Sequence, residues 1–384
     1  MKRSLRKGLT VLTTAAMCMA ALTGCSGNGQ SASAGASADA DVYKIGGIGP
    51  LTGDAASYGN SVKQGAQIAI DEINAAGGVN GKQFELVFED DQNDAEKAIS
   101  AYNKIMDQNV TAILGAVTSG CSIAVGDESV KDGILQITPS GSAQDCTKNA
   151  NAFRICFTDP LQGKTMADYI ADQRFKNIAV IYNVGDEYSK GVADAFIEEA
   201  TANGMNIVAE ESFNTGDVDF KTQLTKIKGT DAEAIFLPIY YAEVAAITEQ
   251  AQTVGLSLPY FGSDGWDGVI AQLNGDTSNI EGATFLTPFV ATSDKEDVKN
   301  FVEAYKKAYT DTPDQFAADG YDGIYAIKLA IEECGDDVTN ENLIAAMTKI
   351  SLNGLTGDMT FTADGEPNKS AMVAVIENGQ YVAK

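Results

Sequence analysis

Histidine is absent from this chain of 384 residues. Its absence excludes Ser-His-Asp and Cys-His catalysis, zinc sites built on histidine, and the usual proton shuttle near neutral pH. Basic residues are also scarce, because 27 Lys and Arg stand against 53 Asp and Glu. So acidic a chain is not expected to bind nucleic acid through its phosphates, nor to hold a membrane through a basic patch. We interpret the acidic surface as a means of keeping the protein dispersed in solution.

Long apolar runs are missing beyond residue 21, so no later membrane crossing is expected. The run at 8–21 follows four basic residues, a pattern typical of an export signal, and it is too short to span a bilayer comfortably. It ends in Leu-Thr-Gly-Cys at 22–25, which resembles the lipobox of bacterial lipoproteins. The resemblance implies cleavage before Cys25 and a diacylglycerol on its thiol. We therefore expect a signal peptide at 1–24 and an extracytoplasmic protein, lipid-anchored to the cell membrane.

The composition changes after Cys25. Residues 26–40 are mostly Ser, Gly and Ala, which is typical of a flexible linker, so 25–41 is predicted to be the lipidated cysteine with its tether. About 360 residues remain after cleavage, enough to bury large cores and to form two domains.

Residue types that bind metals are present but poorly arranged. The cysteines left in the mature part match no zinc or CxxC spacing, and they are Cys121, Cys146, Cys156 and Cys334. A Cys121–Cys146 disulfide and buried free thiols both remain open. Asp90, Asp91 and Asp94 cluster where a strand is expected to end, and helix capping explains them better than a metal site. We expect no metal and no cofactor.

Short apolar runs alternate with amphipathic stretches from residue 43 onward, in two successive series. This order predicts parallel sheets covered by helices on both faces, and the two series predict two such lobes. The end of the chain is predicted to be rich in strands. The expected strands are 43–48, 84–88, 112–114, 134–138, 178–182, 207–210, 234–237, 259–261, 357–361 and 371–377. The expected helices are 61–74, 95–107, 189–203, 220–228, 242–253, 296–310 and 315–334.

Two glycine-containing stretches superficially suggest nucleotide binding. The first, at 47–53, has the spacing GxGxxxG with Pro50 inside it, and a polar loop follows it instead of a helix. The second, at 163–165, has Thr158 where a P-loop requires glycine. Neither is interpreted as a phosphate site. The mature part also lacks an SxxK or GxSxG nucleophile motif, so we expect no enzyme.

The order and spacing of several motifs, taken together, resemble those of the branched-chain amino-acid (Leu/Ile/Val) binding proteins of ATP-driven uptake systems. No single motif decides the resemblance, which covers the chain from residue 43 to its end. The motifs are Ile45–Gly53, Tyr58-Gly59, Asp71–Asn74, Asp90-Asp91, Ile137–Ser140, Phe153-Arg154, Gly262–Gly265 and Gly320–Asp322.

The resemblance implies a two-lobed type I periplasmic-binding-protein fold, an α/β fold with three crossings between the lobes and a ligand cleft between them. It places the N-lobe at 42–160 plus 287–368 and the C-lobe at 161–286 plus 369–384. The crossings would lie near 159–162, Pro288 and Lys369. We expect a monomer.

The resemblance also assigns residues to the recognition of a free amino acid. Ser119 matches the position that holds the ligand carboxylate, and the start of the helix after it offers backbone N–H groups to an anion. Ser140, Gly141 and Ser142 match a second binding loop. Asp264 matches the acidic position that pairs with the ligand ammonium, where well-known relatives have Glu. Because Asp is one methylene shorter, the ligand would sit deeper or the pairing would use water.

Aromatic residues are expected to enclose the ligand side chain. By the same resemblance they are Tyr58, Tyr188 and Tyr240, although a one-residue slip would exchange Tyr240 with Tyr241. Trp266, the one tryptophan, has two open interpretations, contact with the cleft and packing in the core.

These residues predict a binding protein that captures an amino acid, first of all Leu, Ile or Val, and delivers it to an ABC permease. The branched-chain ligand is favoured because the carboxylate and ammonium positions are both occupied, by Ser119 and Asp264. Two alternatives stay open at this point. The same fold could serve as a ligand sensor, or it could bind another small solute such as urea, an amide or an aromatic acid.

Overall fold

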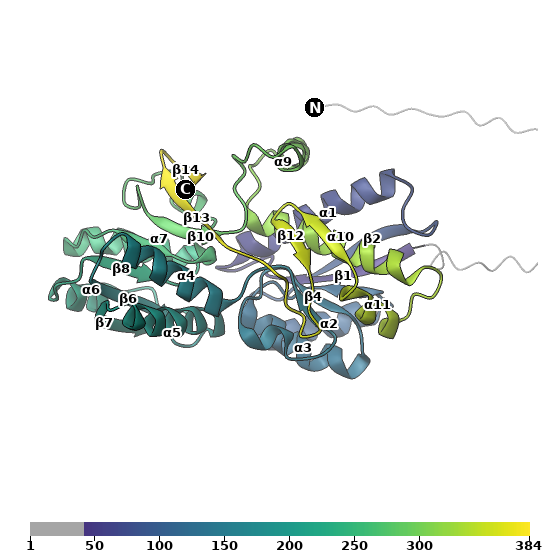
Figure 1. Cartoon of the computed structure of the whole chain (residues 1–384), viewed down its shortest axis with the longest axis horizontal. Helices are drawn as coiled ribbons and strands as arrows, with labels where there is room; N and C mark the ends of the chain where they lie inside the picture. Colours follow the sequence, from purple (N-terminus) through teal and green to yellow (C-terminus); the bar gives the residue numbers. More distant parts are fainter. Residues whose placement is uncertain (1–41) are drawn as a thin grey trace, which may run out of the picture. The chain divides into compact units, whose positions relative to one another are not determined.

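The computed structural model describes residues 42–384. The predicted signal peptide, Cys25 and the tether lie outside the described residues. The described part contains a five-stranded sheet, a seven-stranded sheet and a two-stranded hairpin. In Figure 1, β1, β2 and β4 group with α1 to α3, and β6 to β8 group with α4 to α7.

The five-stranded sheet has the order β2-β1-β3-β4-β5, and every pair in it is parallel. Its strands are β1 (Val42–Gly49), β2 (Gln83–Asp90), β3 (Ala112–Leu114), β4 (Gln136–Thr138) and β5 (Ala152–Arg154). Its helices are α1 (Ala56–Ala75), α2 (Ala95–Met106), α3 (Ser119–Asp132) and α10 (Gln315–Cys334). Neighbouring residues of one strand point to different cores, since Leu114 packs with residues of α1 and α10, and Ile113 with residues of α2 and α3. The sheet is therefore covered on both faces.

The seven-stranded sheet has the order β14-β13-β10-β9-β8-β6-β7, and its five strands from β10 to β7 run parallel. Its strands are β6 (Asn177–Asn183), β7 (Asn206–Phe213), β8 (Ala234–Leu237), β9 (Tyr260–Gly262), β10 (Thr284–Thr287), β13 (Met372–Glu377) and β14 (Gln380–Ala383). Alternation along β8 again separates two cores, because Phe236 packs with α4 (Asp159–Asp172) and α5 (Glu187–Ala202). Ile235 packs on the other side with α6 (Lys221–Lys228) and α7 (Tyr241–Val254). The C-terminal β13 and β14 pair antiparallel at the edge.

The remaining elements are short or lie outside these layers. They are α8 (Val269–Gln272), α9 (Glu296–Tyr309), α11 (Asn340–Met347), the hairpin strands β11 (Ser351–Gly354) and β12 (Gly357–Thr360), and the 3-10 turns η2 (Gln144–Thr147) and η3 (Asp264–Trp266). In residues 42–384, no helix combines the length and the apolar character that a membrane crossing needs.

The chain passes between the two layered lobes three times, after β5, after β10 and after β12. Two of the expected crossing residues, Pro288 and Lys369, lie in the second and third of these segments, and 159–162 begins α4. The third crossing is tied to the first, because the Lys369 ammonium donates to the carbonyl of Ile155 at 2.8 Å and to Thr356 Oγ1 at 2.6 Å. Two parallel-sheet lobes with three connections confirm the predicted fold class.

Candidate functional site

A small cavity lies where loops from both lobes meet. Strands β3 and β4 of one sheet and β6, β8 and β9 of the other all end near it, as expected for ligand sites of parallel sheets. Six of the eight predicted site residues line this cavity, namely Tyr58, Ser119, Ser140, Tyr188, Tyr240 and Asp264. The other lining residues are Val117, Thr118, Gly265 and Phe316.

Ser119 is the first residue of α3 and is held by a neighbouring loop. Its Oγ accepts the backbone N–H groups of Ser142 and Ala143, both at 3.1 Å. Because the oxygen receives two hydrogen bonds, its own O–H proton remains for an acceptor in the cavity. Ser140 donates its hydroxyl to the carbonyl of Val117 at 2.7 Å, which fixes the two loops against each other. Ser119 is thus positioned as a donor to an anion at a helix N-terminus.

The other two predicted residues of the second loop, Gly141 and Ser142, lie behind the cavity lining. The N–H of Ser142 donates to Ser119 Oγ, as described. The carbonyl of Gly141 accepts from the buried guanidinium of Arg154 at 2.9 Å, and a Cβ at Gly141 would lie 2.6 Å from Thr138 Oγ1. In this arrangement Ser142 supports Ser119, Gly141 is held by Arg154, and neither lines the cavity.

Asp264 reaches the cavity from the other lobe. It follows β9, and its N–H donates to Gln162 Oε1 at 2.9 Å. Its Oδ1 is buried and has no hydrogen-bond partner among residues 42–384. Burial removes water from the carboxylate and raises the pKa of Asp264 to about 6. An enclosed carboxylate oxygen without a partner is suited to pair with a cationic group of a ligand.

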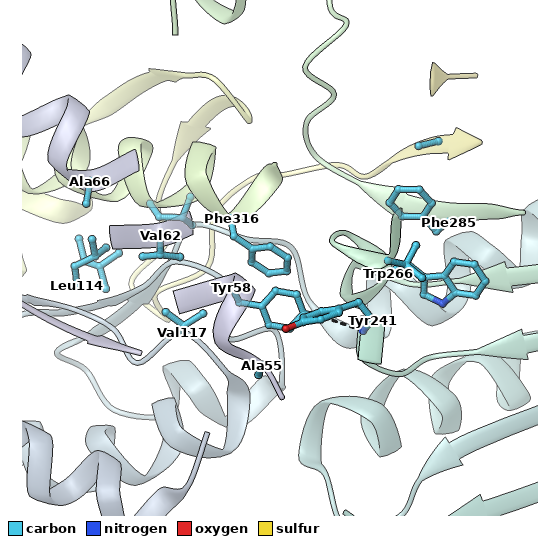
Figure 2. Close-up of a cluster of buried hydrophobic side chains, with 14 of the residues drawn as sticks. Ala55, Tyr58, Val62, Ala66, Leu114, Val117, Tyr241, Trp266, Phe285 and Phe316 are labelled. Carbon is cyan, nitrogen blue, oxygen red and sulfur yellow. Dashed lines mark hydrogen bonds between the residues drawn. The ribbon is translucent and has the colours of Figure 1, made fainter. Parts of the chain in front are cut away.

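Aromatic rings from both lobes pack over the cavity. Tyr188 and Tyr240 stack with ring centres 5.1 Å apart, and Tyr58 packs on Phe316 with centres 4.0 Å apart. Burial raises the pKa of the tyrosine hydroxyls of Tyr58, Tyr188 and Tyr240 well above 10.0, so they remain neutral donors. The Tyr58 hydroxyl donates to the carbonyl of Gly265 at 2.6 Å. It also accepts the N–H of Tyr241 at 3.2 Å, the dashed contact in Figure 2.

Two open points of the sequence concern neighbours of these residues. Tyr240 lines the cavity, whereas Tyr241 packs edge-on against Tyr58 and accepts the N–H of Ser57 at 3.3 Å. Trp266 lies in the core: it is fully buried, donates its ring N–H to the carbonyl of Leu237 at 2.8 Å and stacks with Phe285. Figure 2 shows both rings away from Tyr58 and Phe316.

Phe316 is the lining residue that the sequence did not predict. It is the second residue of α10, nearly 200 residues from Ser119, and the residues around it carry no local signal of a binding loop. Its position depends on how α10 packs along α1, which brings it over Tyr58. Val117 and Thr118 belong to the predicted anion loop, and Gly265 follows Asp264 directly.

The residue types that suggested metals or disulfides have other roles. Asp94 caps α2 by accepting the N–H of Lys97 at 3.0 Å, and Asp90 accepts the N–H of Leu51 at 2.8 Å. The part of the chain from 42 onward contains no group of three or more Asp, Glu or Cys that could hold a metal. The cysteines of that part are free thiols, so Cys121 and Cys146 are not linked.

Two α/β lobes, with a cavity between them that carries a hydroxyl donor on one wall and a carboxylate on the other, define a solute-binding protein. Comparison with known proteins gives the family. The family model for periplasmic binding proteins matches residues 42–380, and the chain belongs to that family.

Individual relatives agree with this assignment. The "Leu/Ile/Val-binding protein homolog 3" of Brucella melitensis is 32% identical, over 84% of this chain and 88% of the relative. The "Leucine-, isoleucine-, valine-, threonine-, and alanine-binding protein" of Pseudomonas aeruginosa is 30% identical, over 85% and 87%. The structure of LivJ from Streptococcus pneumoniae in complex with isoleucine has a TM-score of 0.81 at 32% identity, covering 89% of this chain and all of that one.

Membership confirms several predictions at the level of the family. The relatives are named as binding proteins and not as enzymes, which agrees with the prediction of no catalysis. A periplasmic binding protein works outside the cytoplasmic membrane, so the chain is extracytoplasmic. The roles of individual site residues remain predictions.

Proposed function

We propose that this protein captures a branched-chain amino acid between its lobes and delivers it to an ABC permease. One observation carries the proposal: the Ser119 hydroxyl and the Asp264 carboxylate line one cavity from opposite lobes, with apolar and aromatic side chains beside them. A zwitterionic amino acid would receive a donor for its carboxylate and an acceptor for its ammonium. Val117, Tyr58 and Phe316 would enclose an aliphatic side chain.

The geometry also supports the lobe assignment that the sequence suggested, with the N-lobe at 42–160 plus 287–368 and the C-lobe at 161–286 plus 369–384. Tyr58, Ser119, Ser140 and Phe316 would then belong to the N-lobe, and Tyr188, Tyr240 and Asp264 to the C-lobe. Both lobes would have to close on the ligand to complete the site. Binding is thus a ligand-driven shift toward closed lobes.

The experiment is a thermal-shift screen of the purified protein against the twenty amino acids, urea and short amides. We expect Leu, Ile and Val to raise the melting temperature, because binding to the folded state alone stabilises it. Asp264→Ala should abolish the shift and leave the melting temperature of the ligand-free protein roughly unchanged. No shift with Leu, Ile or Val at millimolar concentration would reject the ligand class, and a shift with urea or an amide would replace it.

We further propose that Cys25 carries the lipid that holds the monomeric protein at the membrane. Residues 26–40, whose composition predicts a tether, would then keep the protein near its permease. Cells expressing Cys25→Ser should lose incorporation of an alkyne fatty acid into the protein and release it from the membrane fraction. The buried Cys156→Ser variant is the control and should remain labelled. Equal labelling of both variants would contradict the anchor.

A further inference from the structure

A second, larger cavity of about 720 Å³ lies between the lobes and has no lining residue in common with the candidate ligand site. One wall comes from α1 and the loop before α10, and the other from the loop after η3 and the β13–β14 turn. Its charged lining residues are Asp267, Asp311, Asp314 and the exposed Lys306. The cavity lining is mostly acidic, and the carboxylates of Asp267 and Asp314 come from opposite lobes.

The Asp267 side chain forms a hydrogen bond between the two lobes. It follows η3, is only 3% exposed, and its Oδ2 accepts the N–H of Gln315, the first residue of α10, at 3.0 Å. Its Oδ1 is enclosed and has no hydrogen-bond partner in the described part of the chain. An ionised carboxylate in that position would keep one oxygen desolvated with no compensation.

Asp314 already occupies the same helix start. It is the N-cap of α10, with Oδ1 accepting the N–H of Ala317 at 2.9 Å and Oδ2 accepting the hydroxyl of Ser61 at 2.7 Å. Both of its oxygens are therefore paired, which favours the ionised form against the burial that raises the pKa of Asp314 to about 6. Its negative charge then opposes a second negative charge on Asp267.

A positive charge is needed at Asp267 Oδ1, and the choice lies between a proton and a larger cation. No cationic side chain of residues 42–384 bonds to this oxygen, and these residues offer no cluster of three or more metal-ligating side chains. Burial first, and then the charge of Asp314, raise the pKa of Asp267 well above 3.8. A proton is the charge that fits.

The other groups facing the pair do not supply a positive charge. Asp264 on the same loop adds a further negative charge, and the pKa values of the nearby tyrosine hydroxyls are raised, so these stay neutral. The tyrosines are Tyr241, Tyr305 and Tyr381. Asp311 is exposed and acidic, and Lys306 extends to solvent.

We propose that Asp267 takes up a proton when the lobes close against Asp314, so that closure and ligand capture are favoured by lower pH. The direction follows from linkage. Separating the lobes returns the carboxyl of Asp267 to water, where its pKa is about 4, whereas closure raises that pKa. The closed state is thus favoured at low pH. The stabilisation from protonated Asp267 is lost as the pH rises through the pKa that this residue has in the closed state.

The first test counts protons during leucine binding, and it rests on the proposed function. Calorimetric titrations at about pH 7 in two buffers of different ionisation enthalpy give the number of protons bound per ligand. We expect the wild type to take up a larger fraction of a proton than Asp267→Asn, which keeps the shape and the acceptor oxygen. Asp314→Asn, which preserves the helix cap, should also reduce the uptake. The control Asp311→Asn should match the wild type, and equal uptake by Asp267→Asn and wild type would overturn the proposal.

The second test needs no ligand, so it separates this inference from the proposed function. Small-angle X-ray scattering of the ligand-free protein should show a smaller radius of gyration at about pH 5.5 than at about pH 8, and Asp267→Asn should reduce the difference. A radius independent of pH in the wild type, or one that responds to added calcium chloride instead, would overturn the proposal. A pH-dependent radius without leucine binding would reject the ligand class and leave the inference standing.

Discussion

At the scale of single residues, Asp264, the proposed partner of the ligand ammonium, has a backbone fixed by hydrogen bonds. Its backbone is fixed on both sides, because its N–H donates to Gln162 and its carbonyl accepts from Gln315 Nε2 at 2.5 Å. Its carboxylate oxygen Oδ1, in contrast, is buried without a partner among the described residues. A desolvated acceptor on a fixed backbone binds a cationic ligand group strongly, since little remains to be reorganised.

Ligand affinity should therefore depend on pH through Asp264. Burial raises the pKa of Asp264 to about 6, and only its ionised form pairs with the ligand ammonium. Affinity should be full above that pH and fall by about 10-fold per unit below it. Calorimetry with leucine from about pH 5 to about pH 8 measures this, in the Asp267→Asn background that removes the opposing effect of the second carboxylate. The double variant with Asp264→Asn added should bind weakly at every pH. If Asp267→Asn alone has the same Kd at about pH 5 and about pH 8, the role of Asp264 is contradicted.

At the scale of elements, the contact between α1 and α10 sets the position of Phe316. Gly65 of α1 lies against the backbone of Ala317, and Gly320 of α10 lies against the backbone of Val62, so a Cβ at either glycine would overlap the other helix. The two helix backbones are so close at these glycines that no side chain fits between them. This contact brings the start of α10, with Phe316, over Tyr58.

Gly65→Ala should lower the free energy of unfolding by about 3 kcal/mol, because backbone atoms cannot move aside as a flexible side chain can. The matched control is Gly120→Ala in α3, where a Cβ meets no atom within 4 Å and the change should be within about 1 kcal/mol of neutral. Calorimetric melting of the ligand-free variants compares the two. Similar melting temperatures would show that the helices can separate without cost.

The same element explains what the sequence could and could not predict. Residues 315–334 were predicted as a helix with the bounds that α10 has, because the apolar spacing is local information. The packing of that helix on α1 is a tertiary property, so Phe316 was missed. Helix α4 was not among the predicted helices. Its Gly163 lies against α5, where a Cβ would be 2.6 Å from the N of Phe196, and this too is a tertiary contact.

The resemblance selected the candidate site residues, and the structure shows which of them lie together. Ser119, Ser140 and Asp264 follow strands directly, and the structure brings them to one cavity. Gly141 and Ser142 were placed in the same loop, but the loop turns so that the Gly141 carbonyl accepts from Arg154 and the Ser142 N–H donates to Ser119. Such turns depend on side chains distant in sequence, which no local pattern reveals.

At the scale of the whole molecule, ligand site and lobe contact share one side chain. The ring of Tyr58 lines the cavity, while its hydroxyl joins the lobes by donating to Gly265 and accepting from Tyr241. Closing the lobes thus completes the cavity wall and forms these hydrogen bonds in the same movement. We therefore expect capture and closure to be coupled through this residue.

Tyr58→Phe should keep the wall and weaken the closed state. Each of the two buried hydrogen bonds of this hydroxyl contributes about 0.5–1.5 kcal/mol, so the Kd for leucine should rise by about 5- to 150-fold, and the ligand-free protein should be less compact in X-ray scattering. Tyr102→Phe is the control, because its hydroxyl bonds to Asp132 at 2.6 Å between α2 and α3 of one lobe. That variant should lose stability without a change in Kd. If both variants bind leucine as the wild type does, Tyr58 only lines the cavity, and the lobes are held closed by other contacts such as that of Gln315 with Asp264.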